Sequence, residues 1–564
     1  MARKRTKTRM ATARDWLARL PRYAPAIAVA SFSVLPFLFF ANERGNIVDV
    51  SVGQALPIAL LSLLIGLALW GLSWLVFRDW TRAAVLAVLL SFPVFHFRTM
   101  VVEFLELFPG VARPSLILYP LIAVLAVIVI LLLRRTKFSR GRTLANYFAV
   151  LGVILLAYQL VVLGIGLERN TGADVRVQNE DLVRAADAAA EDGSADRPEQ
   201  APDIYYLVFD RYGGQIGLSE SYGFSNGPFV RSLEDRGFFV ADASFANYPI
   251  TASSLASSLN GGLLETTGRV DDVRSRQEFY PLIKRPEAGR FLQEHGYQHL
   301  HVGSWWGPSQ TIASADQNYE TAWRFGPDAA HIHASHLASV YLVGTMLVDL
   351  QEKAFGPFQV ENQHGTVFNR QFATLEALAA RAGEAGAPRL VTGHILMPHP
   401  PFAFDAQGRT EIDRSKGARQ NFLDQLAYTN TRIEQTVDAI LAAYPADRKP
   451  VIVLTADEGE YPYVGGYGVD DTDVNLREKS NILNAFYFPS GDYADRDRSD
   501  SPYDTMTAVN NFRVIFNRFF DAGLPLQPDR IFTVRDVNRP YTFVDVTDRV
   551  RAEPGPPGSG IVRQ

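Results

Sequence analysis

The sequence contains no cysteine among its 564 residues. That absence excludes disulfide bonds, cysteine-ligated zinc sites and every mechanism with a cysteine nucleophile. It does not identify a compartment, because an exported domain can do without cysteine. The chain also lacks an excess of positive charge: its net charge is −5, so nucleic acid is not an expected partner. Its length exceeds that of one ordinary domain, and more than one structural unit is expected.

Charged residues are scarce in five apolar segments near the N-terminus. The segments are residues 23–41, 54–77, 83–97, 114–133 and 145–167. A helix needs about 20 apolar residues to cross a bilayer. The third segment is the shortest, and it contains Pro93 and His96. One such segment can be a buried helix of a globular core, but five in succession predict a transmembrane region of five helices over residues 1–167.

Lysine and arginine are unevenly distributed between the flanks of these segments. Fifteen lie before the first segment, after the second and after the fourth, whereas the alternate loops hold three. Because cytoplasmic flanks are enriched in lysine and arginine, we expect a multi-pass protein of the cell membrane with a cytoplasmic N-terminus. Five crossings then place everything after residue 167 outside the cytoplasm. The first segment is not a cleavable signal, because further spans follow it.

The remainder of the chain alternates between buried-strand and helix patterns. Residues 168–202 are polar and predict a linker, in which residues 181–200 are expected to form a partly helical tether followed by a loop. Residues 203–548 predict one α/β domain, and residues 549–564 predict a disordered tail. Strand-like runs at 203–210, 299–303, 389–397 and 450–457 are separated by helix-like runs, which favours a mainly parallel central sheet covered on both faces. An apolar stretch at 334–350 is too short for a secure span, and we expect a buried or interface-lying helix there.

Several polar side chains lie at or near the ends of these strands, where parallel sheets bind ligands. Asp210 follows the first strand, and the pair Asp457–Glu458 follows a late one. Between them lies the hydroxyl-rich stretch "NYPITASSLASSLNG", which contains Thr251. Carboxylate oxygens bind divalent cations, and a cation-bound hydroxyl becomes a usable nucleophile. Paired acids at a strand end are, however, more often helix caps or solvated charges, and the serines also suit a packed helix.

The order of these motifs resembles the sulfatase-like branch of the alkaline phosphatase superfamily. "PDIYYLVFDRYGG" is similar to its first strand and metal-binding acid, "TASSLASSLNGG" to its nucleophile box, "HILMPHPPF" to its histidine region and "VIVLTADEGE" to its late metal-binding strand. The preceding membrane segments make the chain resemble lipoteichoic acid synthases and lipid A phosphoethanolamine transferases in particular. The resemblance implies Thr251 as the nucleophile and a metal site of Asp210, Thr251, Asp457 and Glu458. It implies His394 and His399 as substrate-facing residues, and Trp305 and Arg211 are further candidates for substrate binding.

Two departures from the family pattern affect the expected metal ion and the expected nucleophile. Glu458 stands where the family usually has histidine, so an all-oxygen site would favour manganese or magnesium over calcium or zinc. The Cys-x-Pro-x-Arg box is absent, which excludes formylglycine chemistry. The expected activity is transfer of a phosphoglycerol or phosphoethanolamine head group from a membrane phospholipid, by way of Thr251, to a glycan or lipid of the cell envelope. The alternatives are a phosphodiesterase or phosphatase of the same fold, and an inactive envelope-assembly protein.

Overall fold

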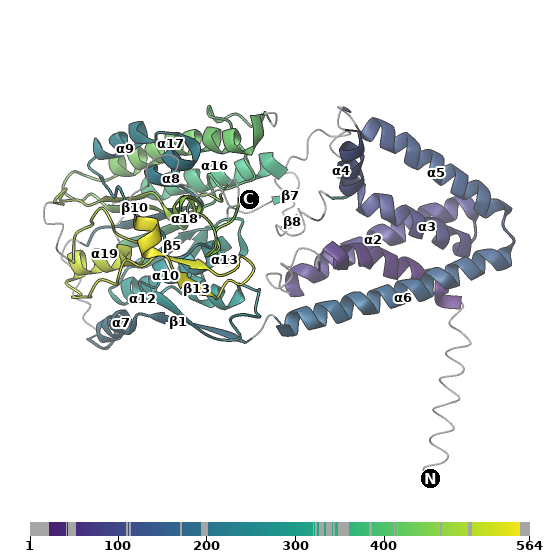
Figure 1. Ribbon diagram of the computed structural model, residues 1–564, viewed down its shortest axis with the longest axis horizontal. Helices are drawn as coiled ribbons and strands as arrows, with labels where there is room; N and C mark the ends of the chain where they lie inside the picture. The colour runs from purple at the N-terminus through teal and green to yellow at the C-terminus, as the bar shows by residue number, and fades with distance from the viewer. Residues whose placement is uncertain are drawn as a thin grey trace, which may run out of the picture. The chain divides into compact units, whose positions relative to one another are not determined.

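The computed structural model divides the chain into two compact units (Figure 1). It describes residues 22–40, 42, 52–108, 111, 114–169, 172–192, 201–319, 321, 324–325, 332–333, 341, 344–347, 360–382, 386–410, 412–413, 416–462, 465–493 and 499–552. The first unit comprises Met1–Asn170 and Ala334–Val360, and the second comprises Thr171–His333 and Glu361–Gln564. The basic stretch before residue 22 and the predicted tail beyond residue 552 lie outside the described residues.

The first unit is built from apolar helices. They are Arg22–Phe40, α2 (Val52–Phe77), α3 (Trp80–Phe95), α4 (Phe97–Leu107), α5 (Ser115–Arg135) and α6 (Phe138–Arg169). Four helices of the described residues are long and apolar enough to cross a membrane, and the bent pair α3–α4 makes a fifth if it counts as one span. The protein is therefore a membrane protein by the length and composition of its helices.

The bend in the third predicted segment has a local cause. The axes of α3 and α4 differ by 59°, and the break lies at His96. Pro93 lies inside the last turn of α3, and a proline has no backbone N–H and crowds the preceding turn. The basic loop expected after the fourth segment is also shorter than predicted, because α5 ends at Arg135 and α6 begins at Phe138.

The apolar stretch at residues 334–350 belongs to the first unit, although it lies within the sequence of the α/β domain. Its described residues are 341 and 344–347. The side chain of Tyr341 is buried and accepts a hydrogen bond from Ser62 at 3.0 Å, and its ring packs edge-on against Phe37. The backbone N–H of Arg98 donates to the carbonyl of Gly344 at 3.1 Å. The chain thus leaves the second unit, contacts the apolar helices and returns.

The second unit contains a seven-stranded sheet in the order β3–β11–β10–β2–β9–β5–β6. The strands are β2 (Ile204–Phe209), β3 (Phe239–Val240), β5 (Gln298–Val302), β6 (Gln317–Tyr319), β9 (Arg389–Ile395), β10 (Val451–Ala456) and β11 (Asn484–Tyr487). Strands β10, β2, β9, β5 and β6 are parallel, and β11 pairs antiparallel to β10 and β3. Every residue of β2 and β10 is buried, as a sheet covered on both faces requires. The predicted mainly parallel sheet is confirmed.

Helices cover the sheet on both faces (Figure 1). One layer contains α9 (Gly227–Glu234), α16 (Val360–Ala379) and α17 (Gly417–Ala443), and the other contains α10 (Thr251–Ser258), α12 (Glu287–Glu294) and α19 (Asn511–Phe520). Tyr206 of β2 stacks on Phe512 with ring centroids 4.4 Å apart, and Phe291 stacks on Phe516 at 4.0 Å. These aromatic contacts join β2, α12 and α19 in one core.

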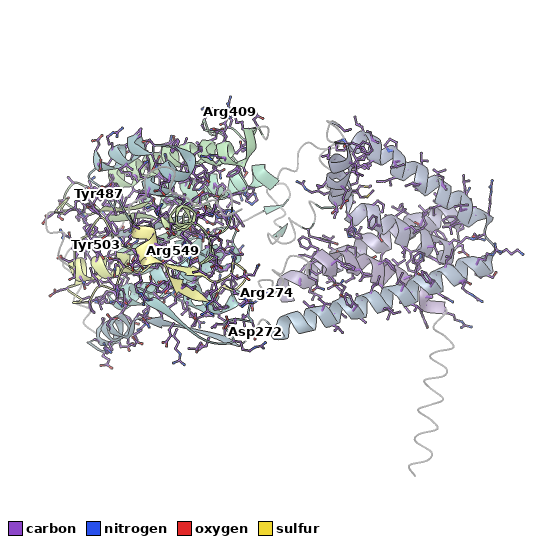
Figure 2. All side chains as sticks on the ribbon, viewed as in Figure 1. Asp272, Arg274, Arg409, Tyr487, Tyr503 and Arg549 are labelled. Carbon is purple, nitrogen blue, oxygen red and sulfur yellow. The ribbon has the colours of Figure 1, made fainter. Side chains whose placement is uncertain are left out.

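The segments predicted as linker and tail contain regular structure. Residues 173–178 form β1 (Ala173–Gln178), which pairs antiparallel with β4 (Leu263–Gly268), and α7 (Glu180–Asp192) follows. At the C-terminus, α20 (Thr547–Arg551) extends past the predicted boundary. Its residue Arg549, labelled in Figure 2, donates to Asp473 at 2.7 Å. The strand β1 and the one-turn helix α20 are short and have little hydrophobic periodicity, which explains why the sequence alone does not indicate them. Helix α7 lies in the part of the linker predicted to be partly helical.

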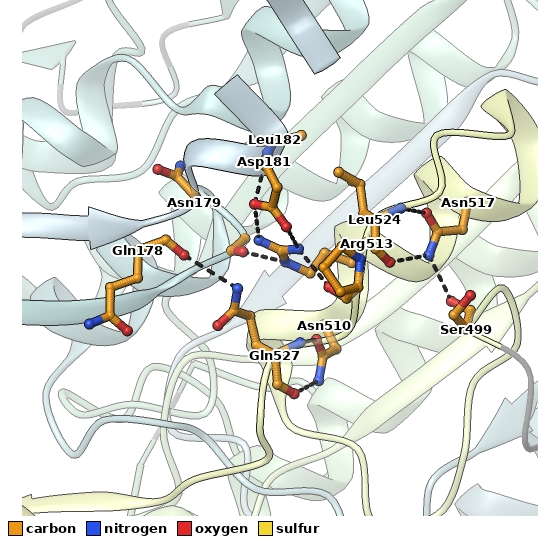
Figure 3. Close-up of polar contacts among 12 residues, drawn as sticks. Gln178, Asn179, Asp181, Leu182, Ser499, Asn510, Arg513, Asn517, Leu524 and Gln527 are labelled. Carbon is orange, nitrogen blue, oxygen red and sulfur yellow. Dashed lines mark hydrogen bonds and ion pairs between the residues drawn. The ribbon is translucent and has the colours of Figure 1, made fainter. Parts of the chain in front are cut away.

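A buried arginine of α19 binds the first turn of α7 (Figure 3). Arg513 of α19 has a fully buried side chain, and it donates to both carboxylate oxygens of Asp181 at 2.5 and 2.8 Å. It also donates to the carbonyls of Gly261 at 2.6 Å and Pro525 at 2.7 Å. The start of α7 is therefore part of the packed unit rather than a tether.

Candidate functional site

The register of three central strands brings distant polar residues together. Ala456 of β10 pairs with Phe209 of β2, and Phe209 pairs with Ile395 of β9. Asp457 and Asp210 each follow directly, so both lie at the carboxyl edge of the sheet. The backbone N–H of Asp210 donates to the carbonyl of Ile395 at 2.9 Å, which continues the ladder into the site. His394 lies one residue earlier in β9.

Asp210, His394 and Asp457 form a group that could hold a metal ion. One ligand atom from each lies within 4.8 Å of the others, and all three side chains are buried. Asp210 Oδ1, His394 Nε2 and Asp457 Oδ2 have no hydrogen-bond partner among the described residues. Buried polar atoms are normally satisfied, and a divalent cation would satisfy all three at once. The donor set of two carboxylates and one imidazole fits such an ion.

The imidazole of His394 is held by Ser309, which in turn contacts Ser304. Ser309 in α13 (Gly307–Gln310) has its hydroxyl 2.8 Å from His394 Nδ1, and Ser304 has its hydroxyl 2.7 Å from that of Ser309. This contact fixes the ring with Nε2 toward Asp457 Oδ2, which lies 4.0 Å away. Burial, with His301 nearby, lowers the pKa of His394 to about 3, so the imidazole is neutral and able to act as a ligand.

The carboxylates at this edge are difficult to ionise together. Burial raises the pKa of Asp210 well above its usual range, and the charges of Asp457 and Glu458 add to that effect. Burial and the charge of Glu458 raise the pKa of Asp457 to about 7, against the opposing effect of the Thr251 hydroxyl. A bound cation would favour the ionised forms of both acids.

Thr251 is the first residue of α10 and lines a cavity of about 180 Å³. Its hydroxyl interacts with the Asp457 carboxylate. The serines that follow have another role: Ser253 and Ser254 are buried, and the hydroxyl of Ser253 donates to the carbonyl of Ile250 at 3.0 Å. Thr251 therefore faces the cavity from the N-terminal end of a helix, where an anionic oxygen is stabilised.

Glu458 is paired with basic side chains and does not belong to the group of three. Its Oε1 lies 2.7 Å from Lys479 Nζ and 3.4 Å from Arg211 Nε. Arg211 has a left-handed backbone with φ 58°, and its backbone N–H donates to Asp457 Oδ1 at 3.1 Å. Burial would lower the pKa of Arg211, but Glu458 and Glu460 outweigh it and raise that pKa. Burial also lowers the pKa of Lys479, against the opposing charge of Glu458.

The cavity brings together most of the candidate residues from the sequence. Asp210, Arg211, Thr251, Trp305, His399 and Glu458 line it, as do Arg276, Trp306, Tyr461, Tyr467 and Lys479. His399 is held near Asp210, because its backbone N–H donates to the carbonyl of Asp210 at 3.2 Å. Sequence reasoning missed Arg276, Tyr461, Tyr467 and Ser309. The composition of a single loop gives no signal for such residues, because tertiary folding alone brings them to the site.

The chain is similar to several solved structures. The C-terminal periplasmic domain of EcEptC from Escherichia coli in complex with Zn has a TM-score of 0.38 and 13% identity, over 66% of this chain and 95% of that one. A putative sulfatase from Bacteroides thetaiotaomicron has a TM-score of 0.35 and 14% identity, over 58% and 72%. An alkaline phosphatase superfamily protein from Vibrio parahaemolyticus has a TM-score of 0.36 and 11% identity, over 64% and 82%. No family model and no curated protein matches the chain.

Proposed function

We propose that this membrane protein is a metal-dependent phosphotransferase with Thr251 as its nucleophile. The donor is a membrane phospholipid with a phosphoglycerol or phosphoethanolamine head group, and the acceptor is a glycan or lipid of the cell envelope outside the cytoplasm. The observation that carries the proposal is the convergence of three buried ligand atoms, unpaired among the described residues, beside the hydroxyl-bearing residue of α10 that lines the cavity.

Asp210, His394 and Asp457 are the residues that would hold the metal. A divalent ion bound there would supply Lewis-acid stabilisation of negative charge on the threonine and phosphoryl oxygens. The imidazole nitrogen weakens the expectation of an all-oxygen site, and imidazole and carboxylate together suit zinc as well as manganese. Manganese and zinc are therefore the two ions to compare, with magnesium and calcium as the oxygen-preferring references.

The side chains of the site can perform the transfer in two balanced steps. In the first step, Thr251 Oγ1 forms a bond to the donor phosphorus, and the bond from phosphorus to the lipid oxygen breaks. The hydroxyl proton passes to the Asp457 carboxylate and then to the leaving lipid oxygen. In the second step, the acceptor hydroxyl replaces Thr251 on phosphorus, and Thr251 recovers a proton. Asp457 is placed to accept the proton of Thr251 because its carboxylate interacts with the Thr251 hydroxyl.

Basic and aromatic residues on the cavity wall suit an anionic head group. Arg211, Arg276 and Lys479 line the cavity, and guanidinium and ammonium groups bind phosphoryl oxygens. His399 and Trp305 lie 6.3 Å apart between ring centroids and form an aromatic side of the same cavity. Burial, with the nearby charge of Arg211, lowers the pKa of His399 well below its usual value, so a neutral imidazole faces the substrate.

The test is head-group transfer by the full chain in lipid bilayers. Phosphatidylglycerol and phosphatidylethanolamine, each labelled in the head group, are supplied separately with Mn²⁺ or Zn²⁺. We expect a covalent phospho-head-group adduct that maps to Thr251 by mass spectrometry. Thr251→Ala should reduce turnover by at least about 1000-fold, as loss of a nucleophile does in other enzymes, whereas Ser253→Ala should retain most activity. An adduct on a serine, or normal turnover of Thr251→Ala, would refute the assignment.

The same experiment separates transfer from hydrolysis. If the adduct on Thr251 forms and the label appears only as a water-soluble product in the presence of envelope glycan and lipid, the protein is a hydrolase of the same fold. If no donor is consumed and no metal is bound, the results favour the alternative that the chain is an inactive envelope-assembly protein.

A further inference from the structure

The loop after β10 brings Glu458 against the end of α18 (Asp473–Ser480) at unusually short range. The backbone N–H of Gly459 donates to the carbonyl of Lys479 at 2.8 Å. A Cβ atom at position 459 would lie 2.0 Å from the carbonyl oxygen of Glu478, so the approach requires glycine. This contact positions Lys479 beside Glu458, so that Lys479 Nζ lies 2.7 Å from Glu458 Oε1.

The pair formed by Glu458 and Lys479 is almost fully buried at the wall of the cavity. The side chains of Lys479 and Glu458 are 3% and 4% exposed. An isolated buried charge is costly, and removal of one partner of such a pair leaves the other uncompensated. The negative charge of Glu458 is therefore already balanced by ammonium, with Arg211 at 3.4 Å as a second contributor.

The geometry at this edge of the sheet favours a single ion. One ligand atom from each of Asp210, His394 and Asp457 lies within 4.8 Å of the others, and Glu458 is not in that group. The Oε1 atom of Glu458 lies 2.7 Å from Lys479 Nζ, and its Oε2 atom has no hydrogen-bond partner among the described residues. A second cation bound by Glu458 would lie close to the ammonium of Lys479, and the repulsion between two positive charges opposes its binding.

We propose that the ammonium group of Lys479 pairs with the Glu458 carboxylate and prevents it from acting as a metal ligand. The site then binds a single divalent ion through Asp210, His394 and Asp457. This inference rests on the proposed function, which requires a bound metal. It deepens that function by naming Lys479 as a positioning residue. It also gives Glu458 a role that differs from the ligand role implied by the sequence.

The test is the metal content of the full-length protein in detergent, measured with Mn²⁺ by elemental analysis and titration calorimetry. We expect about one ion per chain in wild type and in the double variant Glu458→Gln/Lys479→Met, with closely similar dissociation constants. Glu458→Gln alone should bind no more than one ion, and more weakly, because the ammonium of Lys479 is then uncompensated. Asp457→Asn, the matched control, should lose the ion. Lys479→Met should bind about two ions, because Glu458 is then free to act as a ligand. The double variant Glu458→Gln/Lys479→Met, which removes both charges, should return to about one.

Two ions in wild type, loss of the ion in the double variant, or one ion in a folded Lys479→Met variant would each overturn the proposal. If Lys479→Met does not fold, as judged by near-ultraviolet circular dichroism, Glu458→Gln and the double variant decide the question. The proposed function fails separately: the expected stoichiometries together with normal turnover of Thr251→Ala would refute the nucleophile and leave the role of Lys479 intact.

Discussion

At the scale of single residues, the orientation of His394 depends on one hydroxyl. Ser309 lies 2.8 Å from His394 Nδ1 and leaves Nε2 toward the two aspartates. Hydrogen-bond partners of metal-binding histidines fix the ring and its tautomer, and their loss typically costs 10–100-fold in affinity. Ser309→Ala should therefore weaken Mn²⁺ or Zn²⁺ binding by about 10–100-fold, as measured by titration calorimetry.

The matched control for Ser309 is Ser257, which is also buried but donates to the carbonyl of Gly262 at 2.7 Å, away from the metal-binding group. Ser257→Ala should leave metal affinity unchanged. Equal affinities for Ser309→Ala and wild type would show that the imidazole does not need this partner.

The candidate site was partly predictable at this scale. Asp210 and Asp457 follow mainly apolar runs, and the ends of such runs are visible in a sequence. The partner of Glu458 was not predictable, because Lys479 lies on a separate helix and reaches the site only through the contact at Gly459. The hydrogen bond between Ser309 and His394 was hidden for the same reason: the two residues are 85 positions apart.

At the scale of elements, the junction between β10 and α18 depends on a glycine. Gly459→Ala would place a methyl group 2.0 Å from the carbonyl oxygen of Glu478 and 2.8 Å from that of Asn481. We expect the free energy of unfolding to fall by about 1–3 kcal/mol, as for other overpacked positions, in denaturant unfolding of the full chain. A methyl group at Gly307 would meet no described atom within 4 Å, so Gly307→Ala should change that free energy by no more than about 0.5 kcal/mol. Equal losses would argue against a steric cause.

The attachment of α7 predicts a pH dependence of stability. Burial acts to raise the pKa of Asp181, but hydrogen bonds and charge from Arg513 outweigh it, and the pKa falls below its ordinary value of 3.8. A carboxyl whose pKa is lower in the folded state stabilises the protein above its unfolded-state pKa and loses that contribution as the pH falls through the folded-state value. Asp181→Asn should lower the free energy of unfolding by about 2 kcal/mol at pH 7, and the difference from wild type should shrink below about pH 4.

The comparison requires unfolding curves of both proteins from pH 7 to pH 2. Asp187, which is in the same helix and pairs with Arg290 at an exposed position, provides the control. Asp187→Asn should have little effect at any pH, because exposed ion pairs contribute little. A difference between Asp181→Asn and wild type that is constant with pH would rule out the ionised carboxylate as its source.

Elements with a strong hydrophobic pattern were predicted well, and weak ones were missed. The central strands β2, β9 and β10 correspond to the predicted runs, because buried parallel strands have a clear apolar pattern. Strand β1 alternates between valine and polar residues over six positions within a polar segment. It pairs with β4, which is distant in the sequence: Ala173 lies opposite Gly268. No local sequence pattern indicates such a pairing.

At the scale of the whole molecule, the apolar helices and the α/β unit are interleaved in the sequence. Ala334–Val360 belongs to the apolar unit although it interrupts the α/β unit. The contacts of Tyr341 with Ser62 and Phe37 lie within the apolar unit. Tyr341→Ala would remove a buried ring, and such truncations cost about 3–5 kcal/mol. We expect a lower unfolding temperature of the membrane region in detergent, whereas Tyr341→Phe, which loses only the hydroxyl, should have a much smaller effect.

The number of crossings decides on which side of the membrane the candidate active site lies. Four helices qualify as spans by themselves among the described residues, and the bent pair α3–α4 decides between four and five. If α3–α4 did not cross, the basic turn at Arg134–Arg142 would lie opposite the basic N-terminal stretch, against the positive-inside rule. Five crossings place both basic regions in the cytoplasm. A reporter active only outside the cytoplasm should therefore be active when fused after Leu167 and inactive when fused after Lys137. Activity at Lys137 with none at Leu167 would mean that α3–α4 is re-entrant and that the α/β unit faces the cytoplasm.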